Sequence, residues 1–110
     1  MSNITTHVLD TSIGKPAAGI NVVLELKQQQ WEKIGSGVTN SDGRIADLTS
    51  NPLAAGHYRI SFALTEYFDA QKVDAFYPAA HIEFIVKDPD QHYHVPLLLN
   101  PFGYSTYRGS

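Results

Sequence analysis

Apolar and polar residues alternate with a period of two along several stretches of the chain. The apolar members are Ile20, Val22, Leu24 and Leu26, then Tyr58, Ile60 and Phe62, then Ile82, Phe84 and Val86, and finally Tyr93, Val95, Leu97 and Leu99. Successive side chains of a β-strand point to opposite faces, so each stretch is predicted to be a strand with one apolar face. Val23 breaks the alternation only locally. Another extended run is predicted from Trp31 to Thr39.

One helix is predicted, over Thr65 to Lys72. Thr65 is a residue type favoured at the N-cap, an acidic residue follows in the first turn, and Lys72 lies near the end, where its charge suits the helix dipole. Residues 40–43 and 87–91 are rich in turn formers. The first of these turns is expected to close a hairpin that leads into Arg44.

Short strands with one short helix predict an all-β fold. The strands are expected to form two sheets of antiparallel type packed face to face, with the apolar sets as the inner faces. A chain of 110 residues has the length of one ordinary domain, and neither a repeat nor a linker is visible. Residues 1–110 are therefore expected to form a single domain.

Composition and charge narrow the classes of function. Hydrophobic residues make up 43% and charged residues 17% of the chain, which is ordinary globular usage. The basic residues are scattered and the net charge is -3, so neither nucleic acid nor an anionic membrane surface is expected as a partner. No stretch approaches the roughly 20 apolar residues of a membrane span, and the first residues lack the pattern of a signal peptide. We therefore expect a cytoplasmic location.

A pair of histidines is the clearest candidate for chemistry. His92 and His94 flank Tyr93 and are predicted to project from one face of a strand. Three interpretations are open: structural histidines on a polar face, two ligands of a metal ion, or an acid–base pair. A catalytic zinc site needs a third protein ligand, and no spacing identifies one. Because the chain has no cysteine, a disulfide and a thiol nucleophile are excluded.

Other signals are weaker or harder to interpret. Residues 103–105 contain a serine but lack the Gly-x-Ser-x-Gly elbow of many hydrolases. Residues 42–44 carry no Gly-rich phosphate loop and are typical of an ordinary turn. The stretch 101–110 is unusual, because aromatic and hydrogen-bonding residues are concentrated where most chains are frayed.

Several motifs together point to a known family. They are Thr6-His7-Val8-Leu9-Asp10, Gly14-Lys15-Pro16-Ala17, Asp42-Gly43-Arg44, Phe76-Tyr77-Pro78, His92-Tyr93-His94-Val95-Pro96-Leu97-Leu98-Leu99 and Tyr107-Arg108-Gly109-Ser110. With these motifs, which run essentially from end to end, the chain resembles the 5-hydroxyisourate hydrolase family. The terminal Tyr-Arg-Gly-Ser is the most specific of them. Asn100 departs from the pattern, since relatives often have Ser there.

The resemblance implies a fold, a reaction and an assembly. The fold is a transthyretin-like two-sheet β-sandwich of the immunoglobulin-like or prealbumin architecture. The reaction is hydrolysis of 5-hydroxyisourate to 2-oxo-4-hydroxy-4-carboxy-5-ureidoimidazoline, a step of urate degradation in purine catabolism. The assembly is a homotetramer, a dimer of dimers with active sites where the dimers meet. Neither a cofactor nor a metal is implied.

The resemblance also implies the residues of the site. The catalytic set is His7, Arg44 and His94, and the substrate-binding set is His92, Tyr107, Arg108, Gly109 and Ser110. In this hypothesis one of His7 and His94 is the general base for water, the other relays the proton, and Arg44 stabilises the oxyanion. Two other functions stay open: a transthyretin-like carrier that holds a small aromatic ligand without converting it, and a structural sandwich domain.

Overall fold

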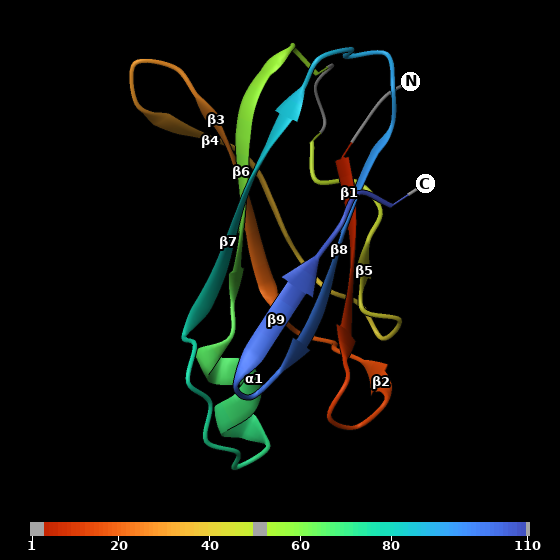
Figure 1. The fold of residues 1–110 in the computed structure, drawn as a ribbon, viewed down its shortest axis with the longest axis vertical. Coiled ribbons are helices and arrows are strands. Elements are labelled where there is room, and N and C mark those ends of the chain that lie inside the picture. Colours follow the sequence, from red (N-terminus) through yellow and green to blue (C-terminus); the bar gives the residue numbers. More distant parts are fainter. Residues whose placement is uncertain (1–3, 50–52, 110) are drawn as a thin grey trace.

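A computed structural model describes residues 4–49 and 53–109, and Figure 1 shows the arrangement of its strands and helix. The elements are β1 (Ile4–Asp10), β2 (Lys15–Pro16), β3 (Asn21–Lys27), β4 (Trp31–Val38), β5 (Arg44–Ile45), β6 (Gly56–Ala63), α1 (Thr65–Ala70), β7 (Ala79–Val86), β8 (Tyr93–Asn100) and β9 (Gly103–Thr106). Every strand predicted from the sequence is present, as β3, β4, β6, β7 and β8.

Two sheets, named here sheet A and sheet B, stack face to face (Figure 1). Sheet A has the strand order β2-β1-β8-β9, with β5 also paired to β1, and sheet B has the order β4-β3-β6-β7. The two-sheet sandwich predicted from the sequence is confirmed. One pairing departs from the expected antiparallel type, because β1 and β8 run parallel, with Ile4 opposite Tyr93 and Asp10 opposite Leu99.

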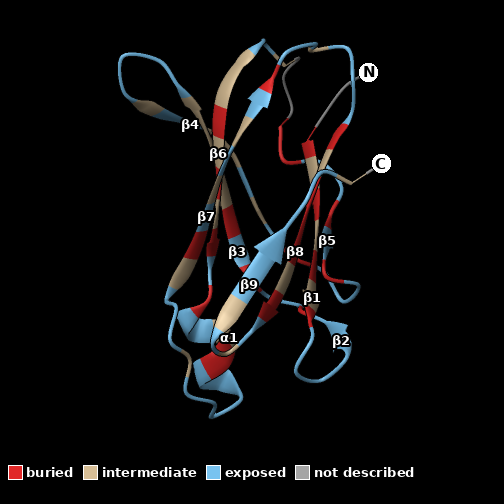
Figure 2. Ribbon diagram, viewed as in Figure 1, coloured by how far each residue is buried: buried red, intermediate tan, exposed pale blue. Residues whose placement is uncertain are grey.

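The core lies between the sheets, on the faces that the alternation predicted. Val22 and Leu24 of β3, Leu97 and Leu99 of β8 and the other inward apolar side chains are buried in one cluster. Figure 2 shows buried positions alternating with less buried ones along the strands. Each such side chain contributes about 1.5–3 kcal/mol when fully buried. If the pairing register of a strand shifted by one residue, its whole set of apolar side chains would turn to the outer face. Burial of the apolar face therefore determines which side chains point outward.

The prediction that a hairpin leads into Arg44 is wrong. The turn itself forms, since the N–H of Gly43 donates to the Asn40 carbonyl at 2.8 Å and Gly43 has a φ of 73°. However, β5 pairs with β1 of sheet A instead of returning along β4 of sheet B. A Cβ at position 43 would overlap the Val8 carbonyl oxygen, so glycine allows this close approach to β1.

The helix α1 is shorter than the predicted range 65–72, and Thr65 is not its N-cap. Leu64 occupies that position without a side-chain capping bond. The Thr65 hydroxyl instead donates to the Pro78 carbonyl at 3.4 Å, across the connection to β7. Buried Phe68 attaches the helix to the core. Within residues 4–49 and 53–109, no helix combines the length and the apolar character needed to cross a membrane.

Candidate active site

The candidate site lies on the outer face of sheet A, where β1 and β8 run side by side. Ile4 and Thr6 of β1 are buried on the inner face, so the alternate residues Thr5 and His7 project outward. The parallel register places Thr5 opposite His94. Residues far apart in the chain therefore meet on one surface.

A cavity of about 260 Å³ opens on this outer face. Its lining residues are Thr5, Thr6, Arg44, Ile45, Ala46, His92 and His94. The guanidinium of Arg44 is a permanent cation, whereas imidazoles titrate close to neutral pH. The cavity thus combines a fixed positive charge with groups that can accept and return a proton.

The hydroxyl of Thr5 lies between the two imidazoles. Its Oγ1 is 2.9 Å from Nε2 of His92 and 2.7 Å from Nδ1 of His94, and both are hydrogen-bond distances. The two rings are 6.4 Å apart between centroids. Because Thr5 occupies Nδ1 of His94, Nε2 is the nitrogen of that ring left to meet a molecule in the cavity.

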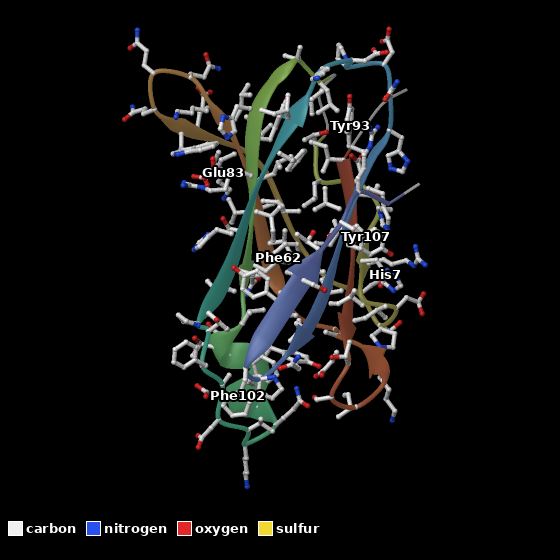
Figure 3. The ribbon with its side chains drawn as sticks, in the orientation of Figure 1. His7, Phe62, Glu83, Tyr93, Phe102 and Tyr107 are labelled. Carbon is white, nitrogen blue, oxygen red and sulfur yellow. The ribbon has the colours of Figure 1, made fainter. Side chains whose placement is uncertain are left out.

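Arg44 reaches the site from the short strand β5, where it is paired with His7 of β1. The preceding turn holds its backbone in place, since Oδ1 of Asn40 accepts hydrogen bonds from the N–H groups of Asp42 and Arg44 at 2.9 and 3.0 Å. Figure 3 shows His7 beside β1, on the side of the sandwich that faces away from sheet B. The local turn therefore positions a cation beside the histidines.

The environment lowers the pKa of His94 from its ordinary value of 6.5. Burial of the ring is the largest cause of the lowered pKa, followed by electrostatic interactions with His92, Arg44 and His7. All four influences disfavour the imidazolium form. At neutral pH His94 is therefore neutral, and that form can take a proton from water.

The C-terminal tail lies against His94. The N–H of Gly109 donates to the His94 carbonyl at 2.9 Å, and a Cβ at position 109 would lie 2.5 Å from Cδ2 of the His94 ring. Only a glycine leaves this contact undisturbed. Ser110, which the sequence also placed in the site, lies outside the described residues.

Tyr107 and Arg108 lie beside the first cavity. The guanidinium carbon of Arg108 is 4.6 Å from the ring centroid of Tyr93, and its Nη2 donates to Oε1 of Gln91 at 3.0 Å. Tyr107 and Arg108 line a second cavity of about 150 Å³, and His94 lines both cavities. The tail thus extends the site towards the open edge between the sheets.

The metal interpretation of the histidine pair requires a third protein ligand. Among residues 4–49 and 53–109, no group of three or more His, Asp or Glu side chains is placed to hold a metal ion. The absence of a metal requirement remains a prediction, and a chelator tests it directly.

Sequence reasoning missed Thr5, although a signal for it was present. Thr5 precedes His7 by two positions and so shares its face on any strand. The sequence pattern does not show which strand pairs with that strand. Thr5 and His92 are separated by 87 positions, and only the parallel pairing of β1 with β8 brings them together.

The sandwich and its outer-face site define the class of protein as transthyretin-like, with an imidazole-lined cavity on sheet A. A family model described as the HIUase/Transthyretin family matches residues 4–109. The chain belongs to this family.

Named relatives are similar over nearly the whole chain. The 5-hydroxyisourate hydrolase of Salmonella typhi is 48% identical over 112 residues, which cover 99% of this chain and 82% of the relative. The structure of Klebsiella pneumoniae 5-hydroxyisourate hydrolase has a TM-score of 0.89 and 38% identity, and the match covers 99% of this chain and 100% of that one. Transthyretin from Sparus aurata has a TM-score of 0.92 and 30% identity, with 99% and 97% covered. The predicted family and fold are confirmed.

Proposed function

We propose that this protein hydrolyses 5-hydroxyisourate to 2-oxo-4-hydroxy-4-carboxy-5-ureidoimidazoline, opening the ring at an amide bond. The observation that carries the proposal is the convergence of Arg44, His92 and His94 on one cavity. Relatives named 5-hydroxyisourate hydrolase support it. Backbone shape alone does not decide between enzyme and carrier, because the TM-score is 0.92 for the transthyretin and 0.89 for the hydrolase. The choice rests on the side chains.

The first demand of the reaction is to activate water. His94 is neutral because its pKa is lowered by burial and by neighbouring positive charge, and its Nε2 can accept a proton from a water molecule. The water oxygen then forms a bond to the ring carbonyl carbon. General base catalysis of this kind typically contributes about 10² to 10⁴ in rate.

The second demand is to stabilise the negative charge that develops on the carbonyl oxygen. Arg44 lines the same cavity and keeps its charge throughout. Its planar fork of N–H donors can hold the oxygen in a fixed geometry, which is the most effective arrangement for an oxyanion. Lys is expected to substitute poorly because it lacks that fork.

The third demand is to return a proton to the departing ring nitrogen. His7 and His92 are the other imidazoles near His94, and both contribute to lowering its pKa. We assign the proton return to this group of imidazoles. Tyr107, Arg108, Gly109 and Ser110 are assigned to shaping the substrate pocket, a role supported by the contact of Gly109 with His94.

We also propose that the protein acts as a homotetramer, a dimer of dimers with active sites between the dimers. The support is twofold. The cavity opens on the outer face of sheet A, where a second subunit could cover it. In addition, Phe76 and Phe102 expose 71% and 70% of their surface, which is unusual for apolar side chains of this size unless they meet a partner. The cytoplasmic location remains a prediction.

The activity is tested by following the ultraviolet absorbance of 5-hydroxyisourate, generated in place from urate by urate oxidase. We expect the decay to accelerate in proportion to protein concentration and to be unchanged by a chelator. His94→Ala and Arg44→Lys should each lower kcat/KM by about 10² or more, because each removes a group that acts on the transition state. His81→Ala and Arg59→Lys are matched controls, since both residues lie on sheet B, far from the cavity.

Two outcomes would contradict the proposal. Near-normal activity in both His94→Ala and Arg44→Lys would remove these residues from the mechanism. Decay no faster than the spontaneous reaction, with folded wild-type protein, would reject the hydrolase. Saturable binding of the substrate analogue urate without turnover would then favour the carrier.

A further inference from the structure

The Thr5 hydroxyl can form hydrogen bonds to both imidazoles in only two arrangements. A hydroxyl has one proton, so it donates to one ring and accepts from the other. In one arrangement Nδ1–H of His94 donates to Thr5, and Thr5 donates to Nε2 of His92. In the other, every donor and acceptor is exchanged. The two arrangements differ in which nitrogen of each ring carries the proton.

The charge of Arg44 favours the first arrangement. With its proton on Nδ1, His94 presents the lone pair of Nε2 to the cavity, which Arg44 also lines. A fixed cation is attracted to a lone pair and repelled by an N–H group. The resting site therefore presents an unprotonated Nε2, which is the form a general base needs.

We propose that Thr5 is a positioning residue of the hydrolysis: its hydroxyl sets the tautomers of His92 and His94 and relays a proton from His94 to His92. This inference rests on the proposed function and concerns the same site. It assigns His94 as the base and His92 as the proton store, whereas Arg44 supplies a fixed positive charge.

Each proton that moves in the relay leaves one named atom and binds to another. As the water O–H bond breaks, its proton passes to Nε2 of His94 and its oxygen bonds to the ring carbonyl carbon. The Nδ1 proton of His94 passes to Oγ1 of Thr5, and the hydroxyl proton of Thr5 passes to Nε2 of His92. When the C–N bond breaks, the same steps in reverse deliver a proton to the leaving nitrogen.

Burial and charge explain why such a relay is useful. His94 is half-buried, and His7, Arg44 and His92 all oppose a positive charge on it. Within one chain, His92 is more exposed than His94. Moving the proton from His94 to His92 therefore transfers the positive charge to the less desolvated of the two rings, which lowers the free energy of the intermediate.

Kinetics on three variants test the relay. Thr5→Val keeps the side-chain shape but removes the hydroxyl, and it should lower kcat by about 10² while KM changes little. Thr5→Ser keeps the hydroxyl and should restore most of kcat. Thr11→Val is the matched control, because its hydroxyl donates to the Leu99 carbonyl at 3.1 Å on the same β1–β8 seam, away from the imidazoles. It should match the wild type.

Nitrogen NMR of the histidine rings provides a readout that does not depend on turnover. In wild-type protein at neutral pH, His94 should carry its proton on Nδ1, and in Thr5→Val this preference should be lost. A wild-type kcat in Thr5→Val, a failure of Thr5→Ser to restore kcat, or a His94 protonated on Nε2 would each overturn the proposal. Wild-type protein that hydrolyses nothing would reject the proposed function, while the ring shifts would still decide whether Thr5 sets the tautomers.

Discussion

At the scale of single residues, two small residues control the orientation of His94. Thr5 contacts one edge of the ring at Nδ1, and Gly109 lies against the other edge at Cδ2. Neither residue titrates, so neither stands out by its chemistry. Held at both edges, the imidazole has one orientation in which Nε2 can face the cavity, and such preorganisation is what catalytic geometry requires.

Gly109→Ala should disable the site while leaving the fold intact. The new Cβ would lie 2.5 Å from Cδ2 of His94, so the ring or the tail must move. Because a displacement of about 1 Å can cost about 10²-fold in rate, we expect a loss of that order in kcat/KM with little change in melting temperature. Steady-state kinetics and thermal unfolding of the variant measure the two effects.

Gly103→Ala provides the matched control in the same tail. Its added Cβ would meet only side-chain atoms of Asn100, at an ordinary contact distance of 3.9 Å. We expect its kinetics to equal those of the wild type. Equal losses in the two variants would mean that the tail, and not the contact with His94, limits the rate.

At the scale of elements, β1 is the strand on which the site depends, since it pairs with β2, β5 and β8. Its last residue, Asp10, is 1% exposed. One carboxylate oxygen accepts hydrogen bonds from the N–H and hydroxyl of Ser12 at 3.0 and 2.6 Å, and the other accepts from the Tyr67 hydroxyl of α1 at 2.7 Å. This contact joins the end of β1 to the helix.

Tyr67→Phe should lower the free energy of unfolding by about 1–3 kcal/mol, because it leaves a buried carboxylate oxygen without its donor. Chemical denaturation measures this loss. Tyr77→Phe is the control, since Tyr77 is exposed and its change should stay within about 0.5 kcal/mol. Equal effects of the two substitutions would mean that the hydrogen bond from Tyr67 to Asp10 does not contribute to the free energy of unfolding.

The same contact predicts a dependence of stability on alkaline pH. Burial, followed by the hydrogen bond to Asp10, raises the pKa of Tyr67 from 10.0 to about 12. Since the unfolded chain loses this proton first, the contribution of Tyr67 is complete below pH 10 and is lost as the pH rises towards 12. In Tyr67→Phe this part of the alkaline loss should be absent.

At the scale of the whole molecule, the exposed aromatic side chains bear on assembly. Phe76 packs edge-to-face on Tyr77, and Tyr77 packs edge-to-face on Tyr104. Phe102 lies next to the start of β9. Together they form an apolar patch at one end of the sandwich, and patches of this kind mark interfaces more often than free surface.

Light scattering should therefore give a mass of about four times the 12.2 kDa of one chain. Dilution into the range where subunits separate should abolish hydrolysis in parallel with the loss of the tetramer, because the proposed site lies between dimers. A monomer that remains active would place the complete site within one chain and reject the intersubunit arrangement.

The sequence by itself determined the strands β3, β6, β7 and β8 with their inner faces, the extended run of β4, and the family. A period of two is a local property, and burial of one face makes it readable without knowledge of the neighbours. The same local logic placed His92 and His94 on one face, and both rings line one cavity, although His92 directly precedes β8 and is not part of the strand. It failed at Thr65, because the hydroxyl found a partner in Pro78 instead of capping the helix.

Only the tertiary structure decided which strands are neighbours. The pairing of β5 with β1 carried Arg44 to the other sheet, and the parallel pairing of β1 with β8 brought Thr5 to His94, 89 positions away. Such contacts depend on how the two sheets are connected, which no local pattern encodes. The residue types of the site are thus visible in the sequence, whereas the hydrogen bonds that orient them arise from the topology.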